Sequence, residues 1–136
     1  MARYVVDPRT LLHIVTTDVK IHADHSLVAP NPVRSQALAL LYQRVRNGEL
    51  DETEALQLHE RLTQVKIRLL GDRVSRRTAW RIAAEHDWPS IESAEYLAVA
   101  KLQADALTTV DEALAAKANG IVPVAPLEAL TASNEG

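Results

Sequence analysis

The chain alternates short strand-like segments with longer helical ones, and this alternation restricts its possible folds more than any other feature. The first unit starts with RYVVD, from Arg3 to Asp7, where two β-branched valines favour a buried strand. Pro8 follows directly and favours the first turn of a helix, because its missing N–H would be unpaired there. Strands joined through helices run parallel. The sequence therefore predicts an α/β fold, with a parallel sheet of four or five strands flanked by helices.

The remaining elements follow from the spacing of apolar residues. Strands are expected at 3–7, 65–70, 106–109 and 121–124, and helices at 10–19, 33–46, 51–64, 73–86, 91–103 and 112–118. The polar segment 20–32 is expected to be a loop with a short extended piece at 27–29. Two groups of apolar residues are expected to face the core, namely Leu38, Leu41 and Leu56 in the earlier helices and Val74, Trp80, Ile82 and Ala83 in the helix at 73–86.

Length and composition limit the class of protein. A chain of 136 residues is typical of one domain, which we expect to cover 1–130, followed by a flexible tail at 131–136. The absence of cysteine excludes a disulfide framework, a cysteine zinc site and a thiol nucleophile, and it suits a cytoplasmic location. No uncharged apolar run approaches the roughly 18 residues of a membrane span, and the N-terminus lacks the apolar core of a signal peptide. We therefore expect no membrane contact.

The net charge of −3 argues against a chain that coats nucleic acid, so any nucleic-acid contact must be local. One local basic stretch runs from Lys66 to Arg81, with Asp72 as its one acid. Within it, Arg73, Arg77 and Arg81 repeat every four residues and share one helix face. Such a face can bind phosphates, because each guanidinium pairs with two oxygens. The alternative is a solvated helix face whose arginines are bridged to acids.

Two acids follow strands of the predicted sheet. Asp7 ends the first strand, and Asp111 comes two residues after Thr109, the end of a later strand. Ligands of parallel sheets bind beyond the carboxyl ends of the strands, so this spacing predicts a site that contains both carboxylates. The alternative for Asp7 is a purely structural role, as the N-cap of the helix that follows it.

Three segments in this order and separation resemble a PIN domain, and most closely the VapC-type toxins of bacterial toxin–antitoxin pairs. They are YVVD near the N-terminus, then APNPVRSQALALLYQRVRNGEL, then SAEYLAVAKLQADALTTVDEALAAKANGIVPV. The resemblance covers about 3–127. It implies a single three-layer PIN-like domain that is a metal-dependent endoribonuclease, with Mg²⁺ or Mn²⁺ as cofactor and RNA as substrate. It also implies a VapB-like antitoxin as inhibitor, and a homodimer.

The resemblance assigns site residues one by one. The family pattern has an Asp after the first strand, a Glu in the second helix, an Asp in a later helix and an Asp after the next strand. Asp7 and Asp111 match the first and last positions, which makes them the implied catalytic residues and metal ligands. The other two acid positions hold Gln36 and Ser93, and the small hydroxyl residue expected two after the first Asp is Arg9. Two of the four expected acids are therefore neutral.

These replacements leave alternatives for how the site works. Mg²⁺ can be held by one or two carboxylates together with water and substrate oxygens, so Asp7 and Asp111 are sufficient in principle for one ion. Glu92, about 100° around the helix from Ser93, is a possible substitute acid, or an ordinary first-turn acid favoured by the helix dipole. Alternatively, Arg9 neutralises the two aspartates and the site is free of metal. A guanidinium of Arg9 within hydrogen-bond reach of either aspartate would support this third alternative.

Two functions follow as hypotheses. The first is a VapC-like endoribonuclease, weakened by the loss of two acids. The second is a catalytically inactive PIN domain that binds RNA or a protein partner without cleavage. In the family, helices near the second and third elements form the groove for the antitoxin's C-terminal helix. The leucines at 38, 41 and 56 could serve that groove as well as the core.

Overall fold

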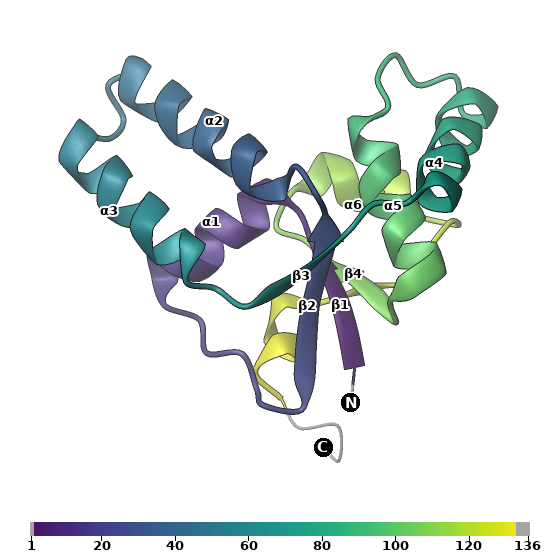
Figure 1. The fold of residues 1–136 in the computed structure, drawn as a ribbon, viewed down its shortest axis with the longest axis horizontal. Helices are drawn as coiled ribbons and strands as arrows, with labels where there is room; N and C mark the ends of the chain where they lie inside the picture. Colours follow the sequence, from purple (N-terminus) through teal and green to yellow (C-terminus); the bar gives the residue numbers. More distant parts are fainter. Residues whose placement is uncertain (1, 133–136) are drawn as a thin grey trace.

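Five parallel strands form the centre of the protein in a computed structural model that describes residues 2–132 (Figure 1). Their order across the sheet is β3-β2-β1-β4-β5, and every neighbouring pair is parallel. The strands are β1 (Ala2–Val6), β2 (His25–Pro30), β3 (Ile67–Leu70), β4 (Ala106–Thr108) and β5 (Val124–Ala125). The predicted α/β architecture with a parallel sheet is confirmed.

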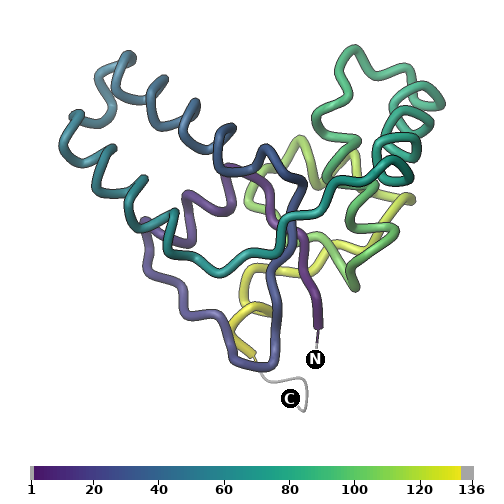
Figure 2. Tube along the Cα trace, viewed as in Figure 1, coloured from purple at the N-terminus to yellow at the C-terminus, as the bar shows by residue number. Residues whose placement is uncertain are grey.

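Helices cover both faces of the sheet, so that the fold has three layers (Figure 1). The helices are α1 (Pro8–Thr17), α2 (Val33–Arg46), α3 (Glu52–Thr63), α4 (Arg73–Glu85), α5 (Glu92–Gln103) and α6 (Glu112–Ala118), with a 3₁₀ helix at Leu127–Leu130. α1, α2 and α3 lie on one side of the sheet and α4, α5 and α6 on the other. The Cα trace in Figure 2 shows the α2–α3 hairpin and the α4–α5 pair diverging as two arms above the sheet. None of the helices described is long and apolar enough to cross a membrane.

The core is aliphatic, as a chain without phenylalanine requires. Val5 and Val28, paired on the central strands, belong to the main buried cluster, which also includes residues of all six α-helices. The largest fully buried side chains are mostly leucines, namely Leu11, Leu12, Leu41, Leu62, Leu97, Leu107 and Leu130. A core of this size holds the carboxyl edge of the sheet, where the predicted site lies, in a fixed position.

The predicted inner face of α4 is wrong for two of its four residues. Ile82 and Ala83 are buried as expected, but Val74 and Trp80 are 60% and 72% exposed. The buried stripe consists of Ser75, Ala79, Ile82 and Ala83. Three of these residues are small, so α4 packs closely on α5, and the bulkier Val74 and Trp80 are left on the outer side.

The expected core leucines of α2 and α3 are also only partly correct. Leu41 is buried, but Leu38 and Leu56 are exposed. α2 buries Val33, Ala37 and Leu41, which repeat every four residues and face the rest of the domain. Leu38 lies on the neighbouring side of that helix. The α2–α3 arm therefore carries more apolar surface than the sequence predicted.

Two predicted segments differ most from the structure. The expected loop at 20–32 contains a complete strand, β2, which pairs with both β1 and β3. The last strand is displaced from 121–124 to Val124–Ala125, because the N–H groups of Ile121 and Val122 both donate to the carbonyl of Ala118 at the end of α6. Of the predicted tail at 131–136, residues 133–136 lie outside the described part of the chain.

Candidate functional site

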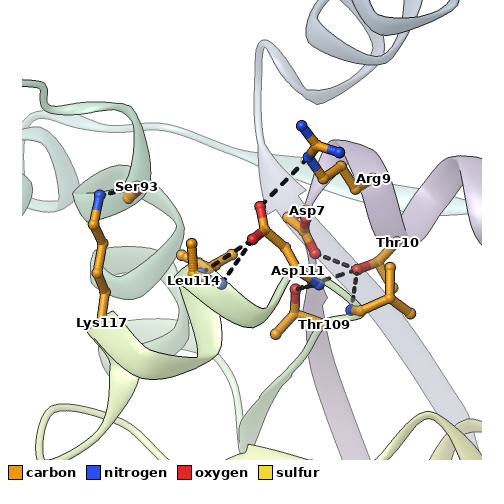
Figure 3. A network of polar contacts seen from close by, with 10 residues as sticks. Asp7, Arg9, Thr10, Ser93, Thr109, Asp111, Leu114 and Lys117 are labelled. Atoms are coloured by element: carbon orange, nitrogen blue, oxygen red, sulfur yellow. Dashed lines mark hydrogen bonds and ion pairs between the residues drawn. The ribbon is translucent and has the colours of Figure 1, made fainter.

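The two predicted acids meet at the carboxyl edge of the sheet. Asp7 follows β1 and Asp111 follows β4 by three residues. β1 and β4 are neighbouring parallel strands, with Val6 paired to Thr108, so both acids emerge at the same edge. Figure 3 shows their carboxylates pointing toward the same space between α1 and α6.

Asp7 is nearly inaccessible to solvent, with 2% of its surface exposed. It occupies the N-cap position of α1, but its side chain makes no capping hydrogen bond. Instead, the Thr10 hydroxyl donates a short hydrogen bond to Oδ1 of Asp7. A role as helix N-cap therefore explains the position of the Asp7 backbone, but it does not explain the direction of the Asp7 carboxylate.

Thr10 connects the two acidic strand ends. Its hydroxyl oxygen accepts a hydrogen bond from the N–H of Val110 at 3.0 Å and lies 3.4 Å from the hydroxyl oxygen of Thr109. The Thr109 hydroxyl in turn accepts from the N–H of Asp111 at 2.9 Å. These contacts fix the loop after β4 against the start of α1 (Figure 3). The sequence reasoning missed both threonines, although Thr10 lies three residues after Asp7, one helical turn away.

Burial controls the charge of Asp7. Removal from water raises the pKa of the Asp7 carboxyl above its ordinary value, and the nearby Asp111 carboxylate adds to this increase. Hydrogen bonds from Thr10 and Thr109 oppose it only in part. Asp7 is thus a buried acid that forms no ion pair within residues 2–132, and a cation at the site would stabilise its ionised form.

The Asp111 carboxylate caps the N-terminus of α6 and forms an ion pair with Arg9. Its Oδ1 accepts hydrogen bonds from the N–H groups of Ala113 at 3.0 Å and Leu114 at 3.3 Å, which caps α6. Its Oδ2 lies 3.6 Å from Nε of Arg9, whose side chain is 57% exposed. This contact is an ion pair, too long for a hydrogen bond. Arg9 therefore points toward the acids, but without the hydrogen bond that we expected of a metal-free site.

A pocket of about 330 Å³ opens in front of the two acids. It is bounded by residues from α1, α2, α5 and α6 together with Asp7 and Asp111, which follow β1 and β4. The pocket brings together every predicted residue of the acidic site, namely Asp7, Arg9, Gln36, Glu92, Ser93 and Asp111. The predicted phosphate-binding arginines are not among its lining residues and lie on α4.

Gln36 bridges two helices across the pocket. Its Oε1 accepts a hydrogen bond from the Tyr96 hydroxyl at 2.6 Å, which ties α2 to α5. Burial, with the charge of Asp7 next in size, raises the pKa of the Tyr96 phenol, so this side chain remains a proton donor. The sequence reasoning missed Tyr96. It lies three residues after Ser93 and hence on the same side of α5.

Ser93 lies beside a cation. Nζ of Lys117 on α6 lies 3.5 Å from Oγ of Ser93 and 5.2 Å from the ring centre of Trp88. The resemblance predicted an acid-to-serine replacement at this position, and here the serine hydroxyl faces a lysine. The sequence reasoning missed Lys117, because nothing in its local pattern indicates that α6 lies against the start of α5.

Asp7 and Asp111 are two pocket carboxylates that could take part in holding a cation. Among residues 2–132, no three acids, histidines or cysteines lie together closely enough to hold a metal ion, so Glu92 does not complete a three-carboxylate site. Asp7 and Asp111 remain, and Mg²⁺ is commonly held by one or two carboxylates plus water and phosphate oxygens. The burial of Asp7 beside Asp111 is an environment that a divalent cation would stabilise.

Comparison with known proteins identifies a fold relative. No family model matches the sequence, and no curated protein matches it. Among solved structures, the crystal structure of PAE2754 from Pyrobaculum aerophilum matches with a TM-score of 0.73 and 24% sequence identity. The match covers 95% of this chain and 92% of that chain. At this identity it shows the fold alone: the three-layer α/β architecture is shared over nearly the whole length of both proteins.

Proposed function

We propose that this chain is a VapC-like PIN-domain endoribonuclease that acts in the cytoplasm and hydrolyses RNA with the help of one Mg²⁺ or Mn²⁺ ion. The observation that carries the proposal is the convergence of the Asp7 and Asp111 carboxylates, from two neighbouring strand ends, on one open pocket. The order of the three sequence segments that resemble the family supports the reaction class. The substitution of two expected acids predicts weak activity.

In this proposal Asp7 and Asp111 hold the cation, which when bound supplies an activated water and stabilises charge on the phosphodiester. Thr10 orients Asp7 through its hydrogen bond, and the start of α6 orients Asp111. Arg9 contributes positive charge beside Asp111, and Lys117 contributes it beside Ser93. Both are suited to contact phosphate oxygens of the RNA.

The partners implied by the resemblance remain part of the proposal. A VapB-like antitoxin would insert an apolar helix along the α2–α3 arm, where Leu38, Tyr42 and Leu56 are exposed. The chain would act as a homodimer. Both statements rest on the resemblance together with the exposed apolar side chains of this arm.

The test combines calorimetric titration of Mg²⁺ and Mn²⁺ with RNA cleavage in the same buffers. The wild type should bind one ion and cut RNA, and Asp111→Asn should lose both, because the amide lacks the charge that holds the cation. Asparagine still caps a helix, so the variant should keep its fold. Glu112→Gln is the matched control, because it removes the same charge from the next residue, which does not line the pocket. A wild type without metal binding or cleavage contradicts the proposal.

The second candidate is a catalytically inactive domain that binds RNA or protein. One specific observation favours it: the Arg9 side chain lies within ion-pair distance of Asp111, where a cation would otherwise bind. The double change Gln36→Glu, Ser93→Asp discriminates between the candidates, since it restores two carboxylates to the pocket. Metal binding and cleavage gained only by the double variant would establish the second candidate.

A further inference from the structure

The outer side of α4 carries an exposed aromatic ring among arginines. Trp80 is 72% exposed, more than any other large apolar side chain in residues 2–132. It lies four residues after Arg76, three after Arg77 and seven after Arg73, so these side chains surround it on one helix face. We refer to Arg73, Arg76, Arg77, Trp80 and Arg81, all of them exposed, as the α4 arginine face.

The arginines of this face are not neutralised by acids. Within residues 2–132, the ion pairs involve Asp18, Asp24 and Asp111, and none includes an arginine of α4. Glu85 lies one turn after Arg81 and does not pair with it in the part of the chain described. The described residues therefore do not support the alternative interpretation, in which acids bridge the arginines of a solvated helix face.

The charge of the face contrasts with that of the whole protein. The chain carries a net charge of −3, yet four arginines occur within the nine residues from 73 to 81. Like charges at neighbouring helix positions repel each other and destabilise the helix. A polyanionic ligand would remove this repulsion. Arg76 donates to the carbonyl of Gly71, and no α4 arginine forms an ion pair within residues 2–132, so the face is available to such a ligand.

Trp80 differs from the second tryptophan of the chain. Trp88 packs against His86, with ring centres 5.1 Å apart, and Lys117 lies over its ring. Neither kind of partner is recorded for the Trp80 ring in the described residues. An exposed indole face between arginines combines the two groups that bind single-stranded nucleic acids, an aromatic platform for a base and cations for the phosphates.

We propose that the α4 arginine face binds single-stranded RNA, with one unpaired base stacked on Trp80 and the flanking phosphates on Arg73, Arg77 and Arg81. The face is roughly 12 Å long at 1.5 Å per residue, which spans a few nucleotides. A duplex would bind less well, because its bases are already stacked and cannot reach the indole. The choice of RNA rests on the proposed function, whereas the surface itself lies outside the acidic pocket.

Binding is measured by fluorescence anisotropy of a labelled 12-nucleotide single-stranded RNA, with EDTA present so that cleavage cannot interfere. Trp80→Ala should weaken binding about 5- to 150-fold, the range expected for loss of one base-stacking aromatic. Trp80→Phe should recover part of that loss, because phenylalanine still offers a stacking surface. RNA should quench the tryptophan fluorescence of the wild type, and the quenching should disappear in Trp80→Phe, where Trp88 is the one indole left.

Salt dependence tests the arginines separately. Arg77→Gln should reduce the slope of log affinity against log salt by about 0.7, the value for one phosphate contact to a single strand. The matched controls lie on α2: Arg46→Gln removes the same charge, and Tyr42→Ala removes another exposed aromatic ring. Both controls should bind RNA like the wild type. Inorganic polyphosphate serves as a probe without bases, and Trp80→Ala should bind it as the wild type does.

Three results would overturn the inference. They are unchanged RNA affinity in Trp80→Ala, an equal loss in the α2 controls, and a concentration-dependent dimer, seen by ultracentrifugation, that buries Trp80 and competes with RNA. The proposed function is tested independently of this inference, because RNA cleavage and metal titration measure it. If the protein cleaves RNA but Trp80→Ala does not weaken RNA binding, the proposed function stands and this inference is wrong. If RNA binds through Trp80 but is never cleaved, this inference stands and the proposed function is wrong.

Discussion

At the scale of single residues, the site depends on a buried acid and the threonine that orients it. Asp7 lies in the interior because β1 is a central strand, and its carboxylate points into the pocket because Thr10 donates to it. The same threonine accepts from Val110, so one hydroxyl supports both acidic strand ends. Removing this hydroxyl should therefore affect stability and the position of Asp7 together.

Thr10→Val tests this role. The change keeps the shape of the side chain but leaves the Val110 N–H and the Asp7 carboxylate without their partner, which should lower the free energy of unfolding by about 1–3 kcal/mol. Chemical denaturation measures the loss. Thr16→Val, at an exposed position of the same helix, should stay within about 0.5 kcal/mol of the wild type. Equal effects of the two changes would contradict a special role for Thr10.

Asp7 should also make stability depend on pH. Its pKa is raised by burial, so the folded protein keeps this proton to a higher pH than the unfolded chain does. The stabilising contribution is complete below the ordinary pKa of aspartate, about 3.9, and is lost as pH rises through the folded-state pKa. Asp7→Asn removes this ionisation. In EDTA it should raise the melting temperature at neutral pH, by an amount that shrinks toward about pH 4. A larger gain in acid than at neutral pH would contradict the expected sign.

At the scale of elements, α4 has an inner face of small residues and an outer face of large ones. Ala79 is fully buried, whereas Trp80, the next residue, is mostly exposed. Hydrophobicity alone would predict a buried Trp80 and an exposed Ala79. Close packing against α5 decides it, because a tryptophan between the two helices would force them apart.

A pair of substitutions separates these faces. Ala79→Leu should lower the free energy of unfolding by about 1–3 kcal/mol, since the added atoms have no space between α4 and α5. Trp80→Ala should change it by less than about 0.5 kcal/mol, because the indole is exposed. Thermal or urea denaturation followed by circular dichroism measures both. A large loss from Trp80→Ala would place the indole in the core and contradict the structure of this helix.

At the scale of the whole molecule, the order β3-β2-β1-β4-β5 creates the pocket. It makes β1 and β4 neighbours although about a hundred residues separate them in the sequence. The start of α1 and the loop that leads into α6 are then joined by a hydrogen bond, and residues of α2 and α5 also line the pocket. A ligand of the pocket therefore contacts both halves of the chain and should stabilise the domain as a unit.

Cation binding should appear as a change in global stability. At a Mn²⁺ concentration 100 times its dissociation constant, the wild type should gain about 2.7 kcal/mol relative to EDTA, and its melting temperature should rise accordingly. Asp111→Asn should show no increase, while Glu112→Gln should match the wild type. An equal rise in Asp111→Asn would mean that the ion binds elsewhere, and the proposed site would be wrong.

Sequence reasoning predicted the parallel α/β architecture, most element positions and the edge at which Asp7 and Asp111 meet. These features follow from local preferences: β-branched runs form strands, periodic apolar residues form helices, and parallel strands share one carboxyl edge. The residues later found to line the acidic pocket, such as Gln36 and Ser93, were assigned by resemblance to a family rather than by periodicity. Their placement together is a result of the fold.

The tertiary structure alone decided which contacts these residues make. The Arg9–Asp111 ion pair, the Tyr96–Gln36 hydrogen bond and the Lys117–Ser93 contact join positions 24 to 102 residues apart. It also decided that Trp80 is exposed, since the buried side of α4 depends on the shape of α5. Local sequence sets backbone preferences and amphipathic patterns. Contacts between distant segments depend on strand order and on the volumes of facing side chains, which no single segment encodes.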